Sequence, residues 1–191
     1  MRNKRLHPTR FFLHRYFYLG VAMLAVFFLV LPMQALVRLP QSLDHWNQSV
    51  LESGGTLADL ASEIRFFLSG SLLYSLLGLE GLCVLFATTG FLSAMILFRH
   101  LFSRRKGMLV VSLPDTRAQD FGRRFVCFLL FSVLPIFLCY GLYLLVIVLN
   151  GLTDYLLLGK LLTRMAVLLL IHFYGFAVGV LSCVLTGYFW A

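Results

Sequence analysis

The chain has 191 residues, of which 60% are hydrophobic and only 13% are charged, with a net charge of +8. A soluble domain keeps roughly a quarter of its residues charged, so this composition excludes an ordinary water-soluble domain and predicts a protein in a lipid bilayer. The basic excess does not indicate nucleic-acid binding, because the Lys and Arg residues lie in short segments beside long apolar runs. The positive-inside rule expects that placement in the cytoplasmic segments of a membrane protein.

The first two segments predict a cytoplasmic N-terminus followed by a membrane crossing. Residues 1–15 are basic and contain no acidic residue. They suit either a short amphipathic helix at the inner membrane surface or a simple basic flank. Residues 16–37 carry no charge, and the next charged residue is Arg38. This uncharged run is longer than the roughly 20 residues that a transmembrane helix needs. We expect Pro32 to kink or end this helix near its outer end.

The next part of the chain predicts an outer loop and a second crossing. Residues 38–65 are polar and slightly acidic, which favours an extracellular loop. We expect the second transmembrane helix at about residues 76–98, inside an apolar run whose one charge is Glu80. An ionisable residue in a spanning segment is a candidate functional residue. Two roles are open for Glu80: a structural role near the outer interface, and a place on a substrate path.

The second half of the chain predicts two more crossings, at about residues 125–149 and 166–190, with a short outer loop between them. Four crossings place both termini in the cytoplasm and define one all-α, polytopic transmembrane domain.

The last crossing carries the sequence's clearest packing signal. Gly175 and Gly179 are spaced as in the small-xxx-small motif that lets two helices approach closely. His172 and Tyr174 are expected to form hydrogen bonds between helices, because no carboxylate or cysteine lies at metal-ligand spacing from either.

The loop between the middle two helices, residues 99–124, is the strongest polar interruption of the second half. Pro114 disfavours helical geometry at the residue before it, so we expect a break there, a short helix through residues 118–124, and re-entry into the bilayer at Phe125. By spacing alone the loop fits an ordinary positive-inside segment as well as a partner-binding one. It holds seven of the 16 Lys and Arg residues: Arg99, Arg104, Arg105, Lys106, Arg117, Arg123 and Arg124.

This loop resembles the segment between the second and third membrane helices of ABC-2-type transporter permeases, especially those of Gram-positive bacteria. The resemblance lies in FRHLFSRRKGMLVVSLPDTRAQDF, and the final VLTGYFWA is similar to the end of the fourth helix in that family. The matching positions are Phe102, Ser103, Arg104, Arg105, Ser112, Leu113, Pro114 and Arg117 in the loop, with Thr186 and Gly187 at the end.

The resemblance implies a partner and a role. In that family the loop is a coupling helix that docks on a separate ABC ATPase subunit, so Ser112, Leu113, Pro114 and Arg117 are the expected contacts. A permease of this kind acts in the plasma membrane as a pair with a second permease chain and moves a substrate outward. The family has six crossings where this chain shows four, so we expect a chain that lacks the last two or is completed by another subunit.

The sequence favours no enzymatic activity of its own. It contains no G-x-x-x-x-G-K-[ST] loop to hold phosphates, so ATP hydrolysis is expected on the partner, with no cofactor and no metal in this chain. The four cysteines lie inside apolar runs without a CxxC pair. The sequence does not select a substrate. An alternative function is a four-helix membrane protein with an interaction or assembly role and no transport of its own.

Overall fold

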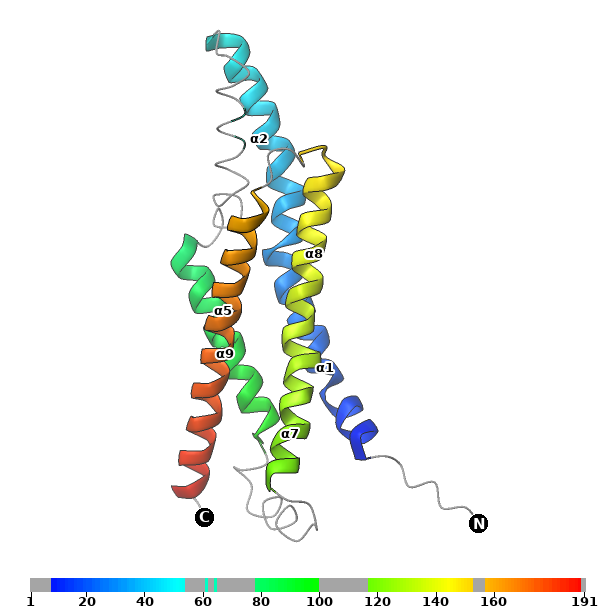
Figure 1. The fold of residues 1–191 in the computed structure, drawn as a ribbon, viewed down its shortest axis with the longest axis vertical. Helices are drawn as coiled ribbons and strands as arrows, with labels where there is room; N and C mark the ends of the chain where they lie inside the picture. Colours follow the sequence, from blue (N-terminus) through cyan, green and yellow to red (C-terminus); the bar gives the residue numbers. More distant parts are fainter. Residues whose placement is uncertain are drawn as a thin grey trace, which may run out of the picture. The chain divides into compact units, whose positions relative to one another are not determined.

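The fold was analysed in a computed structural model that describes residues 8–53, 61, 64, 78–99, 117–152 and 157–189. Those residues are almost entirely helical and contain no β-strand, which confirms the all-α prediction. The helices, shown in Figure 1, are α1 (Pro8–Val30), α2 (Pro32–Ser53), α5 (Gly78–Leu97), α7 (Arg117–Phe128), α8 (Leu134–Leu149) and α9 (Leu158–Phe189). A single π-helical turn, η3 (Leu129–Val133), lies between α7 and α8.

Within the described residues, four helical stretches are long and apolar enough to cross a membrane, as predicted. Large apolar side chains point outward along them: on α9, Leu170 is 68% exposed and Tyr174 is 70% exposed. Water does not tolerate such a surface along several helices, whereas lipid does, so the chain is a membrane protein. The four stretches are Tyr16–Asp44, Glu80–Leu97, Ala118–Leu149 and Leu158–Thr186.

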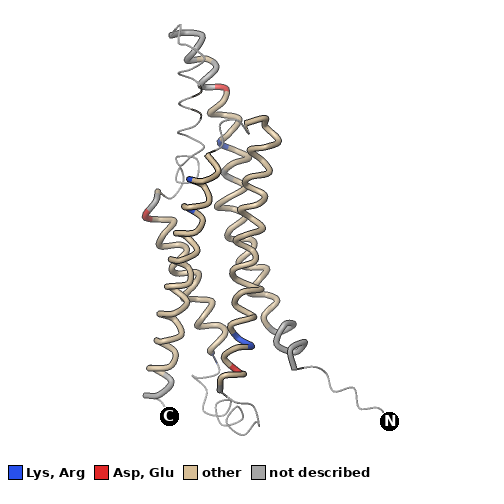
Figure 2. Tube along the Cα trace, in the orientation of Figure 1, with Lys and Arg blue, Asp and Glu red and all other residues tan. Residues whose placement is uncertain are grey.

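The crossing stretches of α5, of α7 to α8 and of α9 carry charged residues only near their ends. Figure 2 shows long uncharged stretches in the middle of the helices, and residues 81–98, 125–149 and 165–189 contain no Asp, Glu, Lys or Arg. A charge in the hydrocarbon region costs several kcal/mol, so this distribution matches crossing helices whose ends reach the polar interface.

The first crossing extends further than the sequence predicted. α1 ends at Val30 and α2 starts at Pro32, so Pro32 marks the break as expected. The helix then continues to Ser53, through residues predicted as an outer loop. The reason is an apolar stripe at helical spacing that persists beyond the proline: Leu31, Ala35 and Leu39 are all buried. The polar side chains of Arg38, Gln41 and Asp44 are exposed.

The third crossing begins without a break. α7 starts at Arg117 and leads through η3 directly into α8, so one helical rod runs where the sequence predicted a surface helix and re-entry at Phe125. In η3, the Leu134 N–H donates to Leu129 O, five residues back. Pro135 explains this turn, because proline has no N–H and its ring clashes with the carbonyl four residues earlier. A wider π turn accommodates that clash.

The remaining two crossings lie close to the predicted ranges. α5 begins at Gly78, whose φ of 68° suits glycine. α9 begins at Leu158, earlier than the predicted 166. Its first turns contain Lys160 and Arg164, whose charges predicted a loop.

The chain divides into two compact units, and the boundary falls within helices α1, α5, α8 and α9. The first unit comprises Met1–Leu24, Leu85–Pro135 and Leu169–Ala191; the second comprises Ala25–Val84 and Ile136–Leu168. The polar features described next all lie within the first unit.

Candidate functional site

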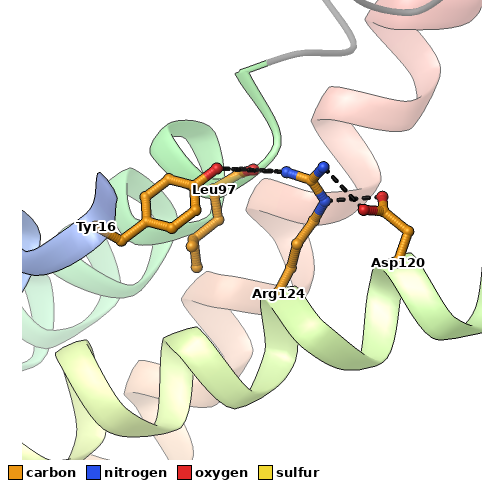
Figure 3. A network of polar contacts seen from close by, with 4 residues as sticks. All are labelled: Tyr16, Leu97, Asp120 and Arg124. Carbon is orange, nitrogen blue, oxygen red and sulfur yellow. Dashed lines mark hydrogen bonds and ion pairs between the residues drawn. The ribbon is translucent and has the colours of Figure 1, made fainter. Parts of the chain in front are cut away.

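Arg124 joins the two helices that flank the central loop. Its Nη1 donates to the carbonyl oxygen of Leu97, at 2.5 Å, and its Nε and Nη2 donate to the Asp120 carboxylate at 2.8 and 3.0 Å (Figure 3). The Tyr16 hydroxyl from α1 completes the group, 3.4 Å from both Arg124 Nη1 and Leu97 O. We call these four residues the Arg124 clamp.

Helix ends explain why these groups meet. Leu97 is the last residue of α5, and the final carbonyls of a helix have no partner within it. A cation at that position satisfies such a carbonyl and also interacts favourably with the negative end of the helix dipole. Asp120 lies in the first turn of α7, where the dipole favours an anion. The clamp therefore joins opposite ends of two helices.

Burial makes the Arg124–Asp120 pair sensitive to change. Arg124 is 3% exposed, and its guanidinium pairs with Asp120 through two parallel hydrogen bonds, the strongest arrangement for this ion pair. The ring of Phe98 lies 5.7 Å from the guanidinium carbon and adds a cation–π contact. Removal of one partner of such a pair leaves a poorly compensated charge, which is strongly destabilising.

A second polar group is buried between α5, η3 and α9. His172 Nδ1 lies 3.0 Å from Phe86 O and 3.3 Å from Thr89 Oγ1, and its Nε2 lies 2.8 Å from Ser132 Oγ. Ser132 Oγ is 2.9 Å from Ser93 Oγ, and Ser93 donates to Thr89 O at 2.7 Å. We call Thr89, Ser93, Ser132 and His172 the His172 cluster. As the sequence predicted, His172 forms hydrogen bonds between helices.

Small residues bring α5 and α9 close enough for these bonds. A Cβ on Gly175 would meet the carbonyl of Ala87, and one on Gly90 would meet the carbonyl of His172. A Cβ on Gly179 would lie 2.7 Å from Ala94 Cβ. The contact is reciprocal, with small residues on both helices, as in membrane helix pairs whose backbones approach closely.

The predicted site residues fall in different places. Gly175 and Gly179 lie against α5, and Glu80 is exposed in the first turn of α5, where the helix dipole favours its charge. Ser112, Leu113 and Pro114 lie outside the described residues. Arg117 is the first residue of α7, and its side chain is also outside the described part.

Sequence reasoning missed the roles of Arg124, Ser132 and Gly90. Arg124 was counted among the loop charges, although Asp120 four residues earlier is the spacing of an ion pair on one helix face. Gly90 lies in the series Ala87, Gly90 and Ala94, a small-residue pattern that matches the one on α9. Ser132 carries no local signal, because its partners come from α5 and α9.

No family model, no curated protein and no solved structure matches this chain. Within the described ranges, no group of three or more His, Cys, Asp or Glu side chains is placed to hold a metal ion. The Arg124 clamp and the His172 cluster are the candidate functional site, and both connect helices.

Proposed function

We propose that this chain is a membrane-spanning permease subunit of an ABC exporter in the plasma membrane. ATP hydrolysis takes place on a separate subunit, which binds the loop between α5 and α7. The observation that carries the proposal is the Arg124 clamp at the base of that loop, between Leu97 and Asp120. The resemblance of the loop to ABC-2-type permeases supports the identity of the partner.

The clamp gives the loop a mechanical connection to the membrane helices. A partner that moves the loop acts on the end of α5 and on the start of α7 together, because Arg124 holds both. α7 continues through η3 into α8, so a displacement at Arg117 passes along one helical rod. Such a connection is what a coupling loop requires.

The rest of the expected assembly follows from this role. The sequence lacks a phosphate-binding loop of its own, so the ATPase is a partner, and two permease chains form the transport unit. Glu80, exposed at the start of α5, is the candidate contact for a substrate on the outer side.

A co-purification experiment tests this function. The tagged chain is purified from membranes of its source cells in mild detergent, and ATP hydrolysis in the eluate is measured while mass spectrometry identifies proteins with a phosphate-binding loop. We expect an ABC ATPase to co-purify with the natural chain. A Leu113→Ala, Arg117→Ala double variant should lose at least about tenfold of the bound ATPase, as expected when a contact worth more than 1.4 kcal/mol is removed.

The matched control is a Leu162→Ala, Lys160→Ala variant, which removes the same kinds of side chain from exposed positions on α9. It should retain the ATPase. Equal binding by the two double variants would contradict the coupling role, and absence of any ABC ATPase from the natural complex would favour an assembly role without transport.

A further inference from the structure

We propose that the end of the first compact unit that carries the Arg124 clamp binds anionic phospholipid. The ligand is a lipid of the bilayer leaflet that surrounds this end, and arginine side chains around the clamp are the groups that bind its phosphate. The inference does not rest on the proposed function, because it concerns the chain and its bilayer, whatever protein binds the loop after α5.

The argument begins with an unequal distribution of charge between the two compact units. The first unit holds twelve of the 16 Lys and Arg residues and two of the 8 Asp and Glu residues, Asp115 and Asp120. The second unit holds the other four basic residues and six acidic ones. The side chains of the first unit therefore carry an excess of ten positive charges, which its own two carboxylates do not neutralise.

The Arg124 clamp gathers part of this charge at one point. Its hydrogen bonds, of 2.5 to 3.4 Å, join α1, the end of α5 and α7 (Figure 3). Each of these three helices has a further arginine one or two residues from its clamp residue: Arg15 on α1, Arg99 after α5 and Arg123 on α7. Three helices thus bring arginines to the same end of the unit, where the Asp120 carboxylate already pairs with Arg124.

This end lies where the hydrocarbon region of the bilayer meets the headgroups. Leu97 is the last residue of the crossing stretch Glu80–Leu97, and residues 81–98 contain no charged residue. An apolar stretch of that length is close to the roughly 20 residues that span the hydrocarbon core. Arg99, at an exposed position directly after it, therefore reaches the level of the lipid headgroups.

Exposed aromatic side chains mark the same level. Tyr18 is 77% exposed on α1, and Phe121, one turn before Arg124 on α7, is 45% exposed. The ring of Phe121 packs against that of Phe98, with 5.8 Å between the centroids. Amphipathic rings such as that of tyrosine are enriched where a membrane protein meets the headgroups. The surroundings of the arginines are therefore those of a membrane interface.

An anionic lipid satisfies both the charge and the apolar surface at this end. A guanidinium pairs with a phosphate through two parallel hydrogen bonds, and basic residues beside a membrane helix attract anionic lipids. A zwitterionic lipid also has a phosphate, but its ammonium group cancels the charge. Free phosphate lacks acyl chains, which would lie along exposed apolar side chains near the clamp, such as Val21 and Val126.

Native mass spectrometry of the purified full chain tests the proposal. The chain is titrated in one detergent with phosphatidylglycerol or with phosphatidylcholine of identical acyl chains, and the bound lipid is counted. We expect phosphatidylglycerol to bind at least about tenfold more tightly, with a preference that falls as salt is raised, because salt screens exposed charges. Equal binding of the two lipids would overturn the proposal, as would displacement of phosphatidylglycerol by excess inorganic phosphate, which would indicate a site for a soluble anion.

Paired variants locate the site. Arg99→Gln with Arg123→Gln should weaken phosphatidylglycerol binding at least about tenfold. The matched control, Arg38→Gln with Lys160→Gln, removes the same charge from exposed positions of the second unit and should keep the affinity of the natural chain. Phosphatidylcholine binding, which should stay the same in both, reports on the fold of the variants. Equal losses of phosphatidylglycerol binding in the two double variants would show an effect of net charge alone and contradict a site at the clamp.

Discussion

At the scale of single residues, the molecule depends on a few polar groups that are buried with their partners. Arg124 is the clearest case, since its guanidinium meets a carboxylate, a carbonyl, a hydroxyl and an aromatic ring. A basic residue near a membrane helix end is expected to extend toward water or headgroups. Arg124 is instead buried between α1, α5 and α7, so its role is connection.

Replacement of Arg124 should show this role. Arg124→Met keeps an unbranched apolar stem but removes the charge and all its hydrogen bonds, and should lower the free energy of unfolding by about 2 kcal/mol. Denaturation in mixed detergent micelles, followed by circular dichroism, measures the change.

The matched control for this prediction is Arg99→Met, which removes the same charge at an exposed position just after α5. It should stay within about 0.5 kcal/mol of the natural chain. Equal effects of the two variants on the free energy of unfolding would mean that the contacts of the clamp do not stabilise the protein beyond the effect of one positive charge.

At the scale of elements, the close contact between α5 and α9 depends on glycine. Gly175 and Gly90 each face a carbonyl of the other helix, so any side chain there separates the two backbones. Outside that contact, Gly141 on α8 has nothing within 4 Å of the position of its Cβ. The two kinds of glycine should respond to alanine in opposite ways.

Gly175→Ala should destabilise the bundle by about 1–3 kcal/mol, the cost of an overpacked contact, because its Cβ would meet the Ala87 carbonyl. Gly141→Ala should be neutral or stabilising by up to about 1 kcal/mol, since alanine is the better helix former. Detergent unfolding of both variants gives the comparison. A stabilised Gly175→Ala variant would show that α5 and α9 do not approach closely.

The helical state of α2 can be tested at Pro40. Pro40 lies inside α2, where it provides no N–H for the carbonyl four residues earlier. Pro40→Ala should stabilise a helix there by about 1–3 kcal/mol, and amides at residues 36–44 should exchange with deuterium at least about tenfold more slowly.

The control for this change is Pro32→Ala, at the first position of α2, where proline is well tolerated. Pro32→Ala should change the deuterium exchange rates of the amides at residues 36–44 much less than Pro40→Ala does. If residues 38–53 form a loop, as their polarity suggested, the exchange rates around Pro40 will not respond to either variant.

At the scale of the whole molecule, hydrophobicity alone predicted the four crossings, because each apolar run exceeds the thickness of a bilayer. The helix ends were less predictable. Arg38 and Asp44 suggested a loop, yet the buried series Leu31, Ala35 and Leu39 carries the helix onward. Lys160 suggested a loop as well, although a helix end at the membrane interface accommodates such a charge.

The candidate site was predictable only in part, for a related reason. Spacing within one helix identified Gly175 and Gly179, but their counterpart Gly90 comes from a helix that is remote in the sequence. The partners of Arg124 and Ser132 are likewise assembled by tertiary packing, which periodicity does not encode. The coupling role assigned to Ser112, Leu113, Pro114 and Arg117 comes from resemblance and stays a prediction.

The central claim is that the loop between the second and third crossings faces the cytoplasm, while the end of α2 lies on the opposite side. Labelling of single introduced cysteines with a membrane-impermeant thiol reagent tests it most directly, with the natural chain and its 4 cysteines as the background. The account predicts that Gln48→Cys, at an exposed position of α2, is labelled in intact cells, and that Ser112→Cys is labelled only after permeabilisation. Strong labelling of Ser112→Cys from the external medium would contradict the account.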